Sequence, residues 1–304
     1  MTSKKNLPAS VHARLLNHAR STARPFQEVF QYYAMERFLY RLSRSRHEQS
    51  FVLKGALMMR VWDAPFARPT KDIDLLGHVP DELDQLENTF KEICAQAVEP
   101  DGMVFRAETL RAERIREHAD YPGVRLRFLA TLGTAEAHMQ IDVAFGDVVV
   151  PQIDTIRYPA LLEFPEPRLG GYSAESVVAE KFEAMVSLGS LNTRMKDFYD
   201  VWLLAGRRDF DGPTLLLAIA KTFQRRSTRV VSDPVSLSAS FATSENTQTL
   251  WSSFRRGGGA SAAPESFQDV AAAITRFLGI VAVAASDGEP FEMTWKAPGP
   301  WQSG

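Results

Sequence analysis

The sequence predicts an α+β fold in which a mixed or antiparallel sheet with flanking helices is followed by a mostly helical C-terminal domain. Two observations support this class. Apolar and polar residues alternate over 104–110, 124–129 and 138–145, as expected for antiparallel strands that follow helices. Beyond residue 171 the apolar spacing becomes helical almost throughout. Helices and strands in separate blocks favour α+β over a regular alternation of parallel strands and helices.

The elements of the N-terminal half follow from local patterns. Residues 10–44 show helical spacing, and the apolar run 51–53 leads to a glycine turn at Gly55 and a short helical stretch. Residues 72–76 are predicted to form the first well-defined β-strand. An amphipathic helix is expected over 81–97, where Asp81 and Glu82 suit the positive end of the helix dipole.

The second half is expected to be helical after a proline-rich connector at 151–171. Expected helices span 173–188, 194–205, 214–225, 248–254 and 266–284. Residues 288–304 show no periodicity and are expected to form an extended tail. The predicted domains are therefore 1–165, with the N-terminal helices and the sheet, then 166–287, and then the tail at 288–304.

Composition excludes several classes of protein. The chain has 304 residues with 45% hydrophobic and 24% charged, which is typical of a globular protein, and one cysteine excludes an internal disulfide framework. No apolar run long enough to cross a bilayer and no secretory signal pattern is evident, so we expect a cytoplasmic protein without a membrane partner. The formal net charge of -2 gives no global sign of nucleic-acid binding.

Local basic patches remain possible RNA contacts. The arginines concerned are Arg106, Arg111, Arg114 and Arg116 in one group, and Arg225, Arg226 and Arg229 in another. The alternative is that they are ordinary solvated faces.

Asp72 and Asp74 are the first candidate site residues. Side chains at i and i+2 of a strand point to the same face, about 6 to 7 Å apart, so both carboxylates can converge while Ile73 enters the core. Mg²⁺ prefers a few hard oxygen ligands and takes the rest of its shell from water and substrate phosphates. An Asp-x-Asp alone is expected about once by chance in a chain of this length.

Asp142 supplies a possible third acid. It alternates with Ile141 and Val143 on the predicted strand and shares a face with His138 and Gln140. If this strand lies beside the strand of Asp72 and Asp74, three carboxylates meet, as in polymerase-β-like nucleotidyltransferases. His138 is then the histidine nearest the proposed site.

Two residues of the helical half complete the candidate set. Lys181 lies in one predicted helix, and Asp197 lies in the next with Asp200 one turn later on the same face. One interpretation is that Lys181 and Asp197 form a structural ion pair. The functional reading has Lys181 reaching a triphosphate and Asp197 orienting that lysine or the attacking group.

The motifs, taken in order, resemble the AbiEii/AbiGii toxin family of nucleotidyltransferases. They are Phe51-Val52-Leu53-Lys54-Gly55, Arg68-Pro69-Thr70-Lys71-Asp72-Ile73-Asp74-Leu75, Ile141-Asp142-Val143, Ala179-Glu180-Lys181-Phe182-Glu183-Ala184-Met185 and Arg194-Met195-Lys196-Asp197-Phe198-Tyr199-Asp200. The likeness covers most of the chain. It implies a toxin of a type IV-like toxin–antitoxin or phage-defence system with a cognate antitoxin, and an enzyme that moves a nucleotide from an NTP to an acceptor, for which the tRNA 3′ end is the best precedent.

The resemblance also implies roles for single residues. Asp72, Asp74, Lys181 and Asp197 would be catalytic, and Asp72, Asp74 and Asp142 would hold Mg²⁺ or Mn²⁺. The residues that would bind the NTP are Lys54, Gly55, Ala56, Arg68, Thr70 and Lys181.

Ala56 departs from the wider nucleotidyltransferase pattern, in which a serine hydroxyl follows the glycine and touches the terminal phosphates. Loss of a hydrogen bond to a charged group costs roughly 1.5 to 3 kcal/mol. Backbone N–H groups at the turn remain as phosphate donors. Ala56 therefore keeps open the alternative of a non-catalytic relative that binds a nucleotide, RNA or a partner protein. The sequence has no P-loop, His-Glu-x-x-His or paired Cys-x-x-Cys motif that would support an NTPase or zinc enzyme.

Overall fold

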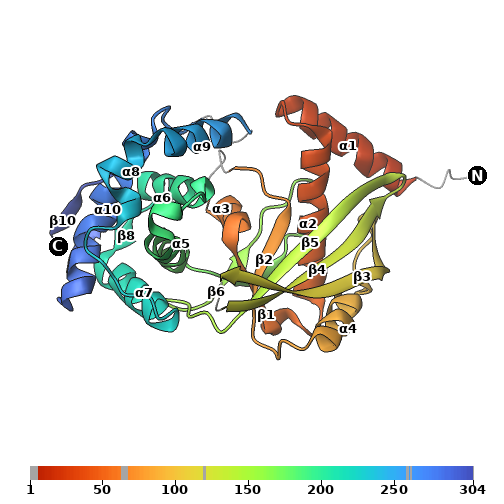
Figure 1. Ribbon diagram of the computed structural model, residues 1–304. Helices are drawn as coiled ribbons and strands as arrows, with labels where there is room; N and C mark the ends of the chain where they lie inside the picture. The colour runs from red at the N-terminus through yellow and green to blue at the C-terminus, as the bar shows by residue number, and fades with distance from the viewer. Residues whose placement is uncertain (1–5, 63–67, 119–120, 258–259, 261, 304) are drawn as a thin grey trace, which may run out of the picture. The chain divides into compact units, whose positions relative to one another are not determined.

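The computed structural model describes residues 6–62, 68–118, 121–257, 260 and 262–303, with side chains left out at 116–118 and 121–122. The chain divides into two compact units (Figure 1). Unit 1 comprises 1–63, 70–146 and 154–171, and unit 2 comprises 64–69, 147–153 and 172–304. Each unit is described on its own below.

A seven-stranded mixed sheet forms the centre of unit 1, in the order β3-β4-β5-β2-β1-β7-β6. The strands are β1 (Phe51–Lys54), β2 (Asp72–Gly77), β3 (Met103–His118), β4 (Tyr121–Leu132), β5 (Ala135–Phe145), β6 (Asp154–Arg157) and β7 (Arg168–Gly171). β2 pairs parallel with β5, and β1 pairs parallel with β7. The other described pairings are antiparallel, including the long meander β3-β4-β5.

One face of this sheet packs on helices. The helices of unit 1 are α1 (Leu7–Ser21), α2 (Phe26–Arg44), α3 (Met58–Val61) and α4 (Leu83–Cys94). α2 runs behind β4 and β5 in the view of Figure 1 and is buried along most of its length. Phe38 of α2 packs against Phe90 of α4, Phe105 of β3 and Phe128 of β4. This aromatic cluster fixes which face of the sheet is apolar.

Unit 2 is mainly helical. Its helices are α5 (Ala174–Leu188), α6 (Met195–Arg207), α7 (Gly212–Arg225), α8 (Ala239–Thr243), α9 (Glu245–Arg256) and α10 (Phe267–Asp287). Ser173 caps α5, because its Oγ accepts the N–H of Ser176 at 3.1 Å. Gly288, in the left-handed conformation with φ 74°, ends α10.

The predicted α+β class with a helical C-terminal part is confirmed, and two local expectations need correction. The connector expected at 151–171 contains β6 and β7, which extend the sheet of unit 1. The stretch 288–304, expected to be a tail, contains β9 (Met293–Trp295) and β10 (Trp301–Ser303), which form a small sheet with β8 (Phe210–Asp211). Trp295 and Trp301 pack on Phe277 of α10, so tertiary burial orders a segment that has no periodicity of its own.

α10 also corrects the expectation that no apolar run is long enough to cross a bilayer. Its 21 residues reach a mean hydropathy of 1.6 over the most apolar window, of which 39% is buried inside unit 2. The helix packs on α6 and α7, and the indole N–H of Trp301 donates to its Phe277 carbonyl at 2.8 Å. Length and composition alone are weak evidence for a membrane span, because core helices meet the same criteria.

Candidate nucleotidyl-transfer site

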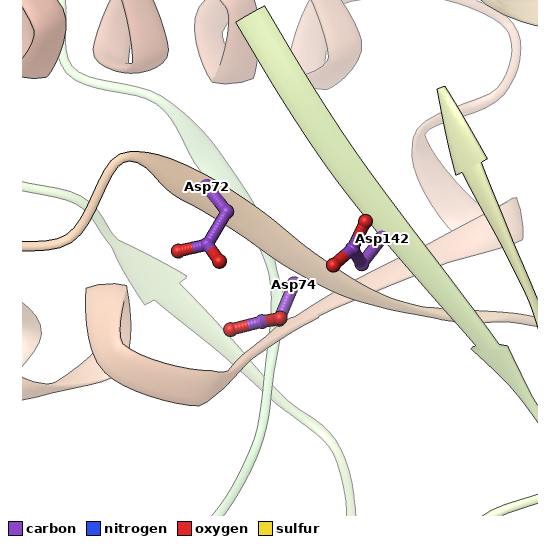
Figure 2. A group of neighbouring side chains, drawn as sticks. All are labelled: Asp72, Asp74 and Asp142. Carbon is purple, nitrogen blue, oxygen red and sulfur yellow. The ribbon is translucent and has the colours of Figure 1, made fainter. Parts of the chain in front are cut away.

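The two aspartates of β2 lie on one face of the sheet, as the strand alternation predicts. Asp72 and Asp74 are both half-buried, whereas Ile73 between them is fully buried. The parallel pairing of β2 with β5 places Asp74 directly opposite Asp142. Asp72, Asp74 and Asp142 therefore point toward one another from two neighbouring strands (Figure 2).

The three carboxylates meet at one point. Each offers an oxygen, and these oxygens lie within 4.8 Å of one another. Like charges this close repel unless a cation lies among them. Hard carboxylate oxygens that converge in this way fit a divalent cation such as Mg²⁺ or Mn²⁺. We call Asp72, Asp74 and Asp142 the acid trio.

The neighbours of the trio fix its carboxylates in place. The hydroxyl of Thr70 donates to Oδ1 of Asp72, and the Thr70 backbone N–H donates to the hydroxyl of Tyr32 at 3.1 Å. Thr70, expected to contact the NTP, thus positions Asp72 in this structure. Lys54, another expected NTP contact, is buried on β1 opposite Asp74.

Gly55 is required by the approach of Asp74. Its φ of +70° lies in the left-handed region, and a Cβ at this position would come within 1.9 Å of Asp74 Oδ2. The next residue, Ala56, is buried and lies in the 3₁₀ turn Gly55–Leu57 that leads into α3. The turn predicted from Gly55 is therefore present beside the trio, without a side-chain hydroxyl at Ala56.

Arg125 is a site residue that the sequence reasoning missed. It lies on β4 directly opposite Asp142, to which its Nε and Nη2 donate at 2.7 Å each. Gln140 adds a third, longer hydrogen bond to Asp142 Oδ2 at 3.3 Å. Hydrogen bonding to Asp142 raises the pKa of the Arg125 guanidinium. The alternation of 124–129 put Arg125 on the polar face, but only strand pairing reveals its partner.

The site residues of unit 2 form a second, buried cluster. Lys181 on α5 donates to Asp197 Oδ1 and lies 2.8 Å from Asp200 Oδ2, both on α6. Arg68 donates to both oxygens of Asp200 at 3.1 and 3.2 Å, and Arg194 Nε lies 2.7 Å from Asp197 Oδ2. We call these five residues the ionic network. Asp200 was noted in the sequence only as a helical neighbour of Asp197, and Arg194 was not singled out.

Electrostatics within the network keep Lys181 and Asp197 charged. Burial would raise the pKa of Asp197, but Lys181 and Arg194 outweigh it and lower the pKa to about 2. Burial would likewise lower the pKa of Lys181, yet Asp197 and Asp200 raise it above the usual value. The structure therefore supports the ion pair that the sequence predicted between Lys181 and Asp197.

The predicted site residues fall into two groups. Unit 1 holds Asp72, Asp74, Asp142, Lys54, Gly55, Ala56 and Thr70, whereas unit 2 holds Arg68, Lys181 and Asp197.

Of the arginines considered for RNA contact, Arg226 is mostly buried and pairs with Glu183 at 2.8 Å, and Arg114 pairs with Asp81. The side chain of Arg116 lies outside the described residues.

Comparison with known proteins identifies the family. Among curated proteins none matches the chain. Two solved structures show limited similarity to this chain. One is a candidate nucleotidyltransferase from H. pylori, with 14% identity and a TM-score of 0.45 over 86% of this chain and 96% of that one. The other is JHP933 from Helicobacter pylori, with 13% identity and a TM-score of 0.46 over 86% and 93%. The model of the family described as nucleotidyl transferase AbiEii toxin, type IV TA system, matches residues 37–273, so the chain belongs to the AbiEii family of nucleotidyltransferase toxins.

Proposed function

We propose that this protein is a Mg²⁺- or Mn²⁺-dependent nucleotidyltransferase that moves a nucleotide from an NTP to an RNA acceptor, with the tRNA 3′ end as the preferred acceptor. The observation that carries this proposal is the acid trio, which places three hard oxygen donors within 4.8 Å of one another. Membership of a type IV toxin family implies a cognate antitoxin. Modification of tRNA would block translation and could serve in phage defence.

The chemistry is an in-line displacement at the α-phosphorus of the NTP. The acceptor hydroxyl oxygen forms a bond to phosphorus, the bond to the bridging oxygen of the β-phosphate breaks, and pyrophosphate leaves while the hydroxyl proton passes to a base. A divalent cation bound to Asp72, Asp74 and Asp142 would supply charge neutralisation and orientation of the phosphates. Thr70 holds Asp72 in place through its hydroxyl, whereas Arg125 contacts Asp142 and would share that carboxylate with the cation.

The remaining roles rest on the family resemblance. Lys181 contacts the phosphates, and Asp197 keeps that lysine charged and oriented through the 2.8 Å contact between them. Arg68 acts through Asp200, because its guanidinium donates to both carboxylate oxygens of that residue. The backbone of Gly55 and Ala56 is the candidate contact for the terminal phosphates.

The second candidate is a non-catalytic relative that binds a nucleotide, RNA or a partner protein. Two observations favour it: Ala56 lacks the hydroxyl, and Arg125 already occupies both oxygens of Asp142. If Arg125 replaced the cation permanently, the trio would bind no metal.

The test uses purified full-length protein with each of the four labelled NTPs, Mg²⁺ or Mn²⁺, and total tRNA. We expect label transfer that requires the metal and is abolished by Asp72→Asn. NTP binding without label transfer to tRNA, other RNA or protein would favour the non-catalytic candidate. Expression of the wild type should stop growth, and Lys181→Ala and Asp197→Ala should relieve the arrest.

A further inference from the structure

A cavity of about 610 Å³ lies on the polar face of the unit 1 sheet and includes one member of the acid trio. Its polar lining residues include Lys71, Asp72, Arg111, Arg127, His138 and Gln140. Leu129, half-buried on the polar face of β4, contributes apolar surface. The volume is in the range of small-molecule sites. Apart from Asp72, none of these lining residues has a role in the proposed metal or NTP site.

Strand register aligns the cavity with the acid trio. Asp72 on β2 pairs with Gln140 on β5, Gln140 pairs with Arg127 on β4, and Arg127 pairs with Arg111 on β3. Residues opposite one another in a sheet share a face, so these four side chains form one row across four strands. The row leads from the candidate metal site toward two arginines.

The charges of the cavity suit phosphate groups. Lys71, Arg111 and Arg127 are exposed cations, and His138 is an exposed imidazole beside them. Arg127 pairs with the exposed Glu113, and Arg111 donates to the Leu110 carbonyl at 2.6 Å. Contacts of exposed side chains are weak enough to be exchanged for a phosphodiester. The guanidinium planes of the two arginines also offer stacking surface to a base.

We propose that this cavity binds the 3′-terminal nucleotides of the acceptor RNA. The inference rests on the proposed function, because it takes the NTP to bind at the Gly55 turn. That turn follows β1, on one side of β2, whereas the cavity lies on the β5-β4-β3 side. In-line displacement requires the attacking hydroxyl and the leaving pyrophosphate on opposite sides of the phosphorus. With the NTP on the β1 side, the acceptor enters from the side of the cavity.

The test measures binding rather than turnover. A fluorescein-labelled single-stranded RNA of eight nucleotides with a free 3′-hydroxyl is titrated with full-length protein, and a fluorescent NTP analogue is titrated in parallel. Arg111→Ala/Arg127→Ala should weaken RNA binding at least about tenfold and reduce its salt dependence by the equivalent of about two phosphate contacts. NTP binding should change by less than about twofold. Lys71→Gln, a milder second variant, should weaken RNA binding about threefold.

Arg114→Ala is the matched control. Arg114 lies on the same strand as Arg111 but pairs with Asp81 and is opposite Val124, on the other face of the sheet. Unchanged RNA binding in the double variant, equal weakening by Arg114→Ala, or weakened NTP binding in place of RNA binding would each overturn the proposal. Absence of transfer by the wild type would remove the proposed enzyme, whereas the RNA titration would still report whether the cavity binds RNA.

Discussion

The acid trio and the ionic network contain similar residues arranged to opposite effect. In the trio three carboxylates converge on one another, and both oxygens of Asp142 also accept hydrogen bonds from Arg125. In the network each buried carboxylate lies against cations, Asp197 between Lys181 and Arg194, and Asp200 between Lys181 and Arg68. Convergent like charges favour an added cation, whereas paired opposite charges compensate one another within the fold.

The function of a charged cluster therefore depends on which of its charges form ion pairs, and the residue types alone do not reveal it. Substitution of Asp72 and Asp74 is expected to remove metal binding and activity at little cost in stability, because both side chains are only half-buried. Substitution in the network is expected to leave a buried charge without its partner and therefore to cost stability as well.

The double variant Asp72→Asn/Asp74→Asn should lose at least about a thousandfold in nucleotide transfer, equivalent to ~4 kcal/mol of transition-state stabilisation. The thermal midpoint should stay the same or rise, because two half-buried charges are removed. Activity is measured by label transfer and stability by differential scanning calorimetry. A large fall in the thermal midpoint would show that the trio, like the network, stabilises the fold.

Asp197→Ala should destabilise unit 2 by about 3–5 kcal/mol, because Lys181, whose side chain is only 12% exposed, is left without one of its partners. Urea unfolding followed by tryptophan fluorescence reports on unit 2, since Trp202, Trp251, Trp295 and Trp301 lie there. Asp209→Ala, which breaks an exposed pair with Lys296, is the control and should shift the unfolding midpoint little. Equal shifts of the unfolding midpoint in both variants would show that the ionic network stabilises unit 2 no more than an exposed ion pair does.

The network also predicts a pH dependence. The folded-state pKa of Asp197 is about 2, below its usual value of 3.8. Its contribution to stability is therefore complete above pH 3.8 and is lost as the pH falls toward 2. The stability of the wild type should decline more steeply than that of Asp197→Ala over this window, measured by urea unfolding at each pH. Parallel curves would mean that Asp197 is not held ionised by Lys181.

Gly55→Ala should weaken Mn²⁺ binding by at least about tenfold, because the new methyl group displaces the Asp74 carboxylate and a non-glycine residue at positive φ adds about 1 kcal/mol of strain. Isothermal titration calorimetry measures the affinity. Gly206→Ala in α6 is the control, because a Cβ there meets nothing within 4 Å. Unchanged metal affinity in Gly55→Ala would show that Asp74 is not a ligand.

Arg125→Gln should strengthen Mn²⁺ binding by about three- to tenfold, since it removes a positive charge that lies 2.7 Å from Asp142. The same titration measures this effect. Arg127→Gln, which changes the next residue of β4 on the same face of the sheet, is the control and should change the Mn²⁺ affinity less. Weaker metal binding in Arg125→Gln would show instead that Arg125 is needed to orient Asp142.

Sequence patterns predicted much of the fold and part of the site. Alternation placed Asp72 and Asp74 on one face of a strand, and helical spacing placed Asp197 and Asp200 on one face of a helix, because both depend on local geometry. β6 and β7 were missed, since these short segments gain strand structure when β7 pairs with β1 and β6 pairs with β7. Arg125 was missed as well, because its importance depends on register with β5.

The sequence alone determined the class of the fold, the order of most of its helices and the identity of the family motifs, because each is encoded in residues close together along the chain. The tertiary structure decided which motif residues meet. Pairing of β2 with β5 brought Asp142 to Asp72 and Asp74, register across β4 brought Arg125 to Asp142, and packing of α5 on α6 brought Lys181 to Asp200. These partners are separated by many residues, and only the burial of the core faces fixes the register that joins them.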